Sequence, residues 1–352
     1  MENLSRQEVK RVIEGKGAVD RPPILYDLWV GNNLFHNNEE EREKWFSRYP
    51  RDIEDVFLNI PDLLHAPADD PNYRWTGMDR ESMAEKGLDA RVLIEEWDSA
   101  EGEKFFETFP NPEYPGLIPE KKPSGERYTI ARWWYGLFER HWSVRGMENA
   151  LMDFYLYPEE VHKLYRRLTD FYLRIMERAC QAMDIDGFFV SDDLGTQKSA
   201  FFSLEIFREF FRPYYKEIFD RAHKLGTHFW LHTCGNIEAF LPDFIEIGLD
   251  VIHPIQKYTM DEKKIAGLYG DKICILAGFD VQQTIPYGTP EEVRAEVRSL
   301  LDAYQRKDGR LMMTMGNGST EDWKLESLEA LYEETLAYGG LRAAMLNAMS
   351  AL

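Results

Sequence analysis

Short apolar runs alternate with longer amphipathic segments over the C-terminal two-thirds of the chain. Each run has the length of a β-strand and is almost continuously apolar, as parallel strands covered on both faces are. The runs are residues 187–191, 228–232, 250–255, 273–278 and 310–315. The segments between them carry apolar residues at steps of three or four, which is the pattern of a helix with one buried face. This regular alternation predicts a parallel sheet with helices packed on it.

Two of the expected helices are marked clearly. Residues 158–183 carry an apolar stripe that runs from Val161 to Ala179. Another helix is expected after Thr289, because Thr289-Pro290-Glu291-Glu292 supplies an N-cap, a proline in the first turn and a capping-box glutamate. A third helical pattern follows Ser203.

The N-terminal third of the chain is less regular. Its expected strands are residues 24–30, 53–60, 92–97 and 128–134. Proline, glycine and charged residues are frequent over 65–127, so we expect an insertion there and an N-terminal extension ahead of the first strand. The fold class expected is α/β, with residues 1–352 forming one (β/α)8 barrel domain.

Composition and charge narrow the function classes. The chain has 352 residues, of which 44% are hydrophobic and 30% charged, which is typical of a globular protein. The net charge of −20 argues against binding nucleic acid or an anionic membrane, and leaves a small-molecule substrate as the expected partner. No apolar stretch approaches the roughly 20 residues of a membrane span. Three cysteines and no apolar signal core predict a protein of the reducing cytoplasm without disulfides.

Polar residues follow five of the expected strands at the point where each strand ends. The active-site residues of a barrel gather at the carboxyl ends of its strands. The residues found there are Asp192, Asp193, His232, Cys234, His253, Asp280 and Asn317. Their coincidence predicts a functional rim, although each has an ordinary structural alternative. The two aspartates could simply form a turn, and His253 could be an ordinary core residue. Asp280 could cap a helix, and Asn317 could adopt the left-handed conformation of a turn.

His232 and Cys234 form the most informative pair. Residues two apart on a strand point to the same side, so the imidazole and the thiol project together before the turn at Gly235. Both groups suit zinc. The alternative is a turn that holds these two residues by chance.

The segment 132–134 is the expected substrate contact. Trp133 and Trp134 are candidates for an aromatic floor of the pocket, with ordinary core packing as the alternative. Arg132 could hold a single carboxylate, and His253, Asp280 and Asn317 complete the expected substrate-binding set.

From about Tyr128 to the C-terminus, an ordered set of motifs resembles the uroporphyrinogen decarboxylase superfamily. The motifs are Asp186-Gly187, Phe207 to Tyr215, His232-Thr-Cys-Gly235, Leu276-Ala-Gly-Phe-Asp280 and Gly288-Thr-Pro-Glu-Glu292. The resemblance implies a (β/α)8 barrel. True uroporphyrinogen decarboxylases carry an arginine-rich segment for their acidic substrate. The matching residues 26–32 contain no arginine, so the chain resembles the corrinoid-dependent methyltransferase-like branch more closely.

That branch implies zinc held by a His-x-Cys pair and a later cysteine in a Gly-Cys-Gly turn. His232 and Cys234 match the pair, whereas Asn317 stands where the third thiolate is expected. The resemblance therefore implies methyl transfer between a small methylated substrate and a corrinoid on a partner protein. The substrate would be a methoxylated aromatic or a methylamine. Asp193, or its neighbour Asp192, would be the catalytic carboxylate. Asp193, His253 or Asp280 would supply a further ligand.

The alternatives are decarboxylation of a porphyrinogen or another carboxylate, and a non-catalytic tetrapyrrole-binding protein on the same barrel. The sequence leaves a homodimer open.

Overall fold

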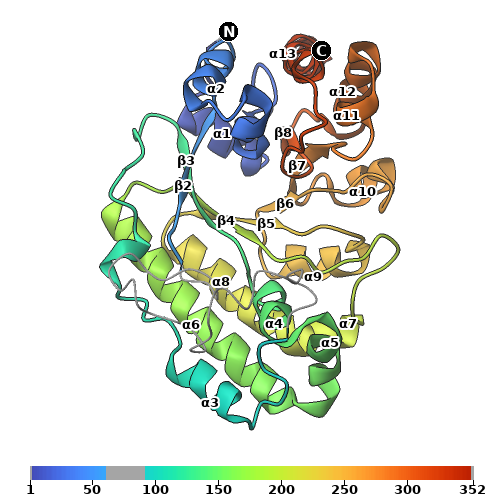
Figure 1. Ribbon diagram of the computed structural model, residues 1–352. Helices are drawn as coiled ribbons and strands as arrows, with labels where there is room; N and C mark the ends of the chain where they lie inside the picture. Colours follow the sequence, from blue (N-terminus) through green and yellow to red (C-terminus); the bar gives the residue numbers. More distant parts are fainter. Residues whose placement is uncertain (1, 61–91, 350–352) are drawn as a thin grey trace.

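Eight parallel strands form a nearly closed barrel in the computed structural model, which describes residues 2–60 and 92–349. The strand order is β1-β8-β7-β6-β5-β4-β3-β2, with helices around the outside (Figure 1). The strands are β1 (Ile24–Leu25), β2 (Ile53–Phe57), β3 (Tyr128–Trp133), β4 (Gly187–Ser191), β5 (His228–His232), β6 (Val251–His253), β7 (Cys274–Phe279) and β8 (Leu311–Met315). The (β/α)8 barrel predicted from the alternating pattern is confirmed.

The helices alternate with the strands from β3 onward. They are α1 (Arg6–Ile13), α2 (Glu39–Phe46), α3 (Ala100–Glu107), α4 (Phe138–Arg145), α5 (Met147–Leu156), α6 (Pro158–Ala182), α7 (Leu204–Ile206), α8 (Arg212–Lys224), α9 (Leu241–Glu246), α10 (Glu262–Tyr269), α11 (Thr284–Tyr287), α12 (Pro290–Tyr304) and α13 (Leu325–Met349). A π-helix, Phe207–Phe211, joins α7 to α8, and shorter 3-10 turns lie at Asp27–Trp29, Asn32–Phe35, Pro115–Leu117 and Glu238–Phe240. Within the described ranges, no helix combines the length and the apolar character needed to cross a bilayer.

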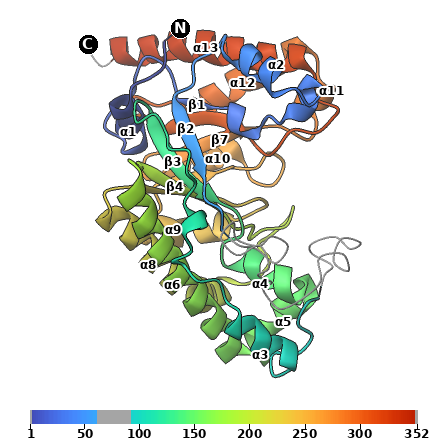
Figure 2. The ribbon, with the colours of Figure 1, turned by 60° about the vertical axis from the view of Figure 1, so that its left-hand side comes forward.

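The two helices marked in the sequence form as expected. The stripe from Val161 to Ala179 on α6 is buried, and α6 packs beside α8 on the outside of the barrel (Figures 1 and 2). At α12 the hydroxyl of Thr289 accepts the N–H of Glu292 while the Glu292 carboxylate accepts the N–H of Thr289. The capping box therefore sets where α12 begins.

The N-terminal third departs from the expected strands. β1 has only two residues, because the chain turns into a 3-10 helix at Asp27. The expectation of a strand at 92–97 is wrong. Leu93 and Ile94 are buried there in irregular backbone, and the Trp97 indole donates to the buried carboxylate of Asp153. Of the expected insertion, residues 65–91 lie outside the described residues, and the rest carries α3.

The N-terminal extension closes one end of the barrel. Helix α1 brings Arg6 and Lys10 onto the buried carboxylate of Asp186, just ahead of β4. The same carboxylate accepts the N–H of Thr129 on β3. These contacts fix α1 against the amino ends of β3 and β4, opposite to the strand ends that carry the polar residues.

Aromatic side chains fill the inside of the barrel. Trp230 of β5 stacks on Tyr128 of β3 with ring centroids 5.6 Å apart, and it contacts Phe189 of β4 at 5.8 Å. Gly187 makes room for this layer, because a Cβ there would lie 2.7 Å from the hydroxyl of Tyr128. The packed layer gives the site above it a rigid floor.

The gap between β1 and β2 is bridged by one carboxylate. These strands are the two ends of the strand order, and no β1–β2 pairing occurs in the described part of the chain. Asp52, fully buried beside β2, accepts the N–H of Ile24 at 2.9 Å and two N–H groups of Arg21 at 2.6 and 2.8 Å. It also accepts the N–H of Leu4. Asp52 therefore closes the barrel where backbone pairing does not.

We predict that Asp52→Ala lowers the free energy of unfolding by about 3–5 kcal/mol, because it leaves the buried guanidinium of Arg21 without its carboxylate. Denaturant unfolding followed by circular dichroism measures the change. Glu329→Gln is the control. It breaks the half-exposed pair with Arg48 and should cost less than about 1 kcal/mol. Equal effects of the two substitutions would contradict the role given to Asp52.

Candidate functional site

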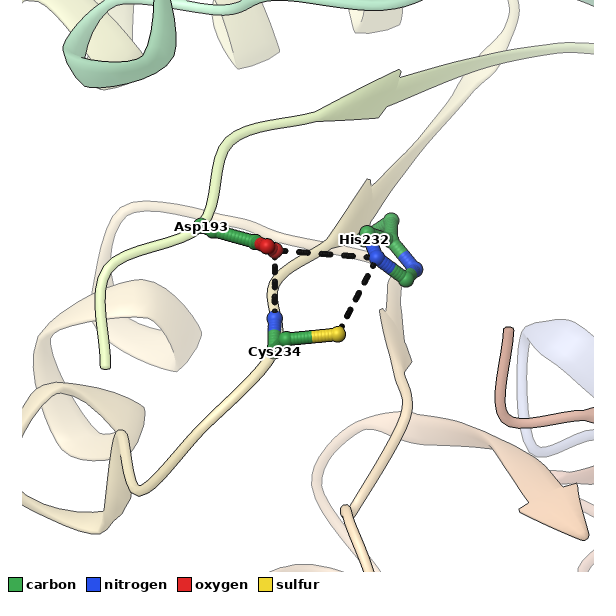
Figure 3. Close-up of side chains that lie close together, drawn as sticks. All are labelled: Asp193, His232 and Cys234. Atoms are coloured by element: carbon green, nitrogen blue, oxygen red, sulfur yellow. Dashed lines mark hydrogen bonds and ion pairs between the residues drawn. The ribbon is translucent and has the colours of Figure 1, made fainter. Parts of the chain in front are cut away.

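Three side chains with metal-binding atoms meet at the carboxyl ends of β4 and β5 (Figure 3). His232 ends β5, Cys234 lies two residues beyond it, and Asp193 lies two residues beyond β4. Nε2 of His232 is 3.4 Å from Sγ of Cys234 and 3.6 Å from Oδ1 of Asp193. The same Oδ1 accepts the N–H of Cys234 at 2.7 Å. The structure thus brings together residues that the sequence places 41 positions apart.

Two glycines press the loops after β4 and β5 against each other. Gly235 has φ of +85°, and a Cβ there would lie 2.2 Å from the carbonyl of Gly195. A Cβ on Gly195 would in turn lie 2.7 Å from the backbone nitrogen of Asn236. Only glycine permits this close approach. The contact holds Asp193 beside the turn that carries Cys234.

A chain of hydrogen bonds sets the tautomer of His232. Nε2 of the fully buried His253 lies 2.8 Å from the carbonyl oxygen of Met315, which can only accept, so Nε2 of His253 carries the proton. Burial lowers the pKa of His253 well below its usual value and that of His232 below its own, so both rings are neutral. Nδ1 of His253 therefore accepts the N–H of Nδ1 of His232 at 2.7 Å. The lone pair of His232 is left on Nε2, facing Cys234 and Asp193.

A cavity of about 620 Å³ opens beside these groups. It is lined by Leu28, Trp29, Gly31, Asn33, Arg132, Trp134, Tyr135, Glu139, Trp142, Ser191, Asp193, His232, Asn317, Gly318 and Ser319. A smaller cavity of about 110 Å³ reaches Cys234, Asp280 and Asn317 from the β6–β8 side. The two cavities share Asn317, whose amide donates to Sγ of Cys234 at 3.7 Å.

Two of the acidic groups at this end of the barrel hold their protons unusually tightly. Burial, reinforced by Asp193 and Asp192, raises the pKa of Glu139 well above its usual range. The hydroxyl of Ser191 donates to this carboxyl group at 3.0 Å. Burial also raises the pKa of the Cys234 thiol, with Asp193 adding to the effect. The cavity therefore contains a protonated carboxyl group on one wall.

Asp192, the second catalytic candidate, lies in a structural position away from the cavity lining. Its carboxylate is fully buried and accepts the N–H groups of Leu137, Phe138 and Glu139, where α4 begins, and the hydroxyl of Tyr215. Burial raises its pKa to about 6. Asp192 fixes the loop after β3, while its neighbour Asp193 faces the cavity.

Two further candidates lie away from the large cavity. Trp133 is 1% exposed and packs between Tyr172 of α6 and Phe188 of β4, so it is a core residue and not a substrate contact. His253 reaches neither cavity within the described lining and contacts His232 instead.

The other four candidates line a cavity. Arg132 and Trp134 line the large one, and Asn317 lines both. Asp280 lines only the small cavity, and its carboxylate caps the start of α11 through Gln282, Gln283 and Thr284.

Trp29 and Glu139 are among the residues of the cavity wall that the sequence pattern did not single out. Trp29 follows β1 and stacks on His253, with ring centroids 5.0 Å apart. Its position after a strand is the signal that could have found it. Glu139 lies on the first turn of α4, where nothing in the local pattern separates it from a surface glutamate.

The donor set fits a zinc ion. A carboxylate, an imidazole and a thiolate are all zinc ligands, and the usual bond lengths place pairs of ligands roughly 3.3–3.6 Å apart in a tetrahedral site. The separations of 3.4 and 3.6 Å agree with that spacing, and all three ligand atoms lie within 4.8 Å of one another. Three protein ligands beside a cavity leave a fourth position for a substrate atom, as catalytic zinc sites do.

Comparisons with known proteins find similarity to methyltransferases. The methylated-thiol–coenzyme M methyltransferase of Methanosarcina mazei is 26% identical over 162 residues, which cover 45% of this chain and 41% of that protein. The match thus spans less than half the length of this relative. The solved structure of a methyltransferase from Methanosarcina mazei superimposes with a TM-score of 0.60 at 13% identity, covering 96% of this chain and 99% of the other, and shows the same fold.

The family itself is shown by a broader match. The family model described as uroporphyrinogen decarboxylase (URO-D) covers residues 142–338, more than half of the chain. The similarity to the Methanosarcina mazei methyltransferase agrees with the methyltransferase-like branch that the motifs predicted. The chain therefore belongs to the uroporphyrinogen decarboxylase family.

Proposed function

We propose that this protein is a zinc-assisted methyltransferase that moves a methyl group between a small methylated substrate and a corrinoid carried by a partner protein. The substrate is a methoxylated aromatic compound or a methylamine. One observation carries the proposal. The ligand atoms of Asp193, His232 and Cys234 converge beside a cavity of about 620 Å³. Within this proposal the whole chain acts as one barrel domain.

Asp193, His232 and Cys234 would hold the zinc ion. His232 is ready to bind, because its hydrogen bond to His253 leaves the lone pair on Nε2. Cys234 binds as a thiolate after losing its proton, and Asp193 supplies an oxygen ligand. When bound, zinc would act as a Lewis acid that polarises the atom carrying the methyl group.

The residues of the cavity wall would handle the proton. When the bond between the methyl carbon and its heteroatom breaks, the electron pair remains on the heteroatom, which then needs a proton. The protonated carboxyl group of Glu139 lines the same cavity and can supply it. The reduced corrinoid on the partner protein would supply the electron pair for the new bond to the methyl carbon.

The size of the cavity suits a small substrate and not a corrinoid. Small-molecule sites have volumes of roughly 300–1,000 Å³, and about 620 Å³ falls within that range. The corrinoid would therefore stay on its carrier protein and approach the open end of the barrel. Decarboxylation of a porphyrinogen with many carboxylates has little support, because Arg132 is the one arginine or lysine in the described lining of this cavity.

A direct assay tests the proposed function. We expect zinc-loaded protein to consume cob(I)alamin, followed by its absorbance, when a methoxylated aromatic or a methylamine is supplied. Cys234→Ser should lose this activity while keeping the circular dichroism spectrum, because Cys234 lies at the end of the barrel. Failure with all methylated substrates, or formation of coproporphyrinogen from uroporphyrinogen, would contradict the proposal.

The two adjacent aspartates should behave differently. We predict that Asp193→Asn lowers zinc affinity by more than about 100-fold, because it removes a ligand. Residues that only hydrogen-bond to a metal ligand contribute roughly 10–100-fold. Asp192→Asn should keep zinc and lower the free energy of unfolding by about 1–3 kcal/mol, since it disturbs the acceptor of three backbone N–H groups. Metal analysis and denaturant unfolding measure the two effects. Zinc loss confined to the Asp192 variant would reverse the assignment.

His253 should act on zinc through His232. We predict that His253→Leu weakens zinc binding by roughly 10–100-fold, because Nδ1 of His232 loses its acceptor. His253→Asn should restore most of the affinity, since its side-chain oxygen lies two bonds from Cβ, as Nδ1 of histidine does. Nitrogen-15 NMR of the metal-free protein reports the His232 tautomer directly. An equal loss of zinc affinity in both variants, with the His232 tautomer unchanged, would show that His253 acts only through its packing against His232.

A further inference from the structure

Arg132 sets the charge of the large cavity. Among the described residues that line it, Arg132 is the one arginine or lysine, and Glu139 and Asp193 are the acids. The buried Glu139 carboxyl group is already bonded to the hydroxyl of Ser191 at 3.0 Å. Under the proposed function, Asp193 is a zinc ligand. The group that remains to meet a charged substrate is therefore the guanidinium of Arg132.

The guanidinium is held in one orientation. Its Nε donates to the carboxylate of Asp55 at 2.6 Å. Its central carbon lies 4.8 Å from the ring centroid of Phe57 and 5.2 Å from that of Trp134, so the guanidinium packs against both rings. Asp55 is outside the described lining of the cavity, so it anchors Arg132 from behind.

No hydrogen bond from the terminal nitrogens of Arg132 to another described residue is recorded. Within the described residues, the recorded hydrogen bond of this side chain uses Nε alone, and 18% of the side chain is exposed. A guanidinium with two free terminal nitrogens can bind both oxygens of a carboxylate. A second carboxylate on the ligand would find no further arginine or lysine in this wall.

Aromatic rings connect Arg132 to the candidate zinc site. The ring of Trp134 contacts the guanidinium of Arg132, and its centroid lies 6.5 Å from that of His232. Trp29 stacks on Trp134 at 5.9 Å, and Trp142 contacts Tyr135 at 6.3 Å. All four rings line the cavity. A flat aromatic ligand can pack along this wall, with one end at Arg132 and the other at His232.

We propose that the large cavity binds an aromatic monocarboxylate, with the carboxylate on the terminal nitrogens of Arg132 and the methyl-bearing atom at Asp193, His232 and Cys234. The identity of the methyl-bearing end rests on the proposed function. The recognition of the carboxylate rests on Arg132 and the aromatic wall. A methylammonium ion has the wrong charge for Arg132 and fills little of the cavity.

The test compares ligands of one shape and different charge. Quenching of tryptophan fluorescence in the full-length, metal-free protein is titrated with methoxybenzoate, methoxybenzyl alcohol and benzyltrimethylammonium. We expect the acid to bind roughly 10-fold or more tightly than the alcohol, because a charge-assisted pair is lost in the alcohol. Equal binding of acid and alcohol, or tighter binding of the cation, would overturn the proposal.

Variants locate the carboxylate. Arg132→Met should abolish the preference for the acid and leave binding of the alcohol within a few-fold of wild type. Arg127→Met is the matched control. Arg127 lies just before β3, pairs with Glu54 and is outside the described cavity lining, so this variant should keep the preference. A preserved preference in the Arg132 variant would overturn the proposal. Should that variant not fold, Arg132→Lys and the ligand comparison in the wild-type protein decide the question.

Binding and turnover separate this inference from the proposed function. Tight binding of methoxybenzoate without methyl transfer would support the ligand class proposed here and contradict the proposed reaction. Methyl transfer from an amine or a neutral ether, together with no preference for the acid, would support the proposed reaction and contradict the ligand class.

Discussion

The carboxylate of Asp52 holds together the two ends of a barrel that backbone pairing leaves open. It binds Arg21 and the backbone of Ile24, so β1 stays beside β2 although the two strands form no ladder. The position of Trp29, at the end of the 3-10 helix that follows β1, depends on this closure. Trp29 covers the His232–His253 pair, and a shift of β1 would therefore uncover the inner side of the candidate metal site.

The candidate site combines rigid backbone contacts with a neutral hydrogen-bond chain. The close approach of Gly195 and Gly235 places Asp193 beside Cys234. The chain from Met315 through His253 to His232 then selects one ring nitrogen as the ligand. Because neither buried histidine carries a charge, this orientation avoids the large desolvation cost of a buried ion. Outer contacts of this kind orient metal ligands in many proteins.

Membership of the family does not by itself determine which reaction this chain catalyses. The barrel and its motifs belong to the uroporphyrinogen decarboxylase family, yet its large cavity has one arginine and four aromatic rings in its described wall. A polycarboxylate needs several cations, whereas a flat substrate with a single charge needs one. A shared barrel supports different reactions when the residues at the strand ends differ.

The sequence by itself determined the barrel, the strand ends and the His232–Cys234 pair, because each follows from a local period of two or of three to four residues. Tertiary structure alone decided which aspartate faces the cavity, since Asp192 is taken by the start of α4. The tertiary structure also places His253 in a hydrogen bond with His232 and outside the cavity lining. The segment 92–97, expected as a strand, is instead irregular and bonded to Asp153 through Trp97. Glu139 became a cavity acid only when folding buried it beside Asp193. These outcomes depend on contacts between segments far apart in the chain, which local periodicity does not encode.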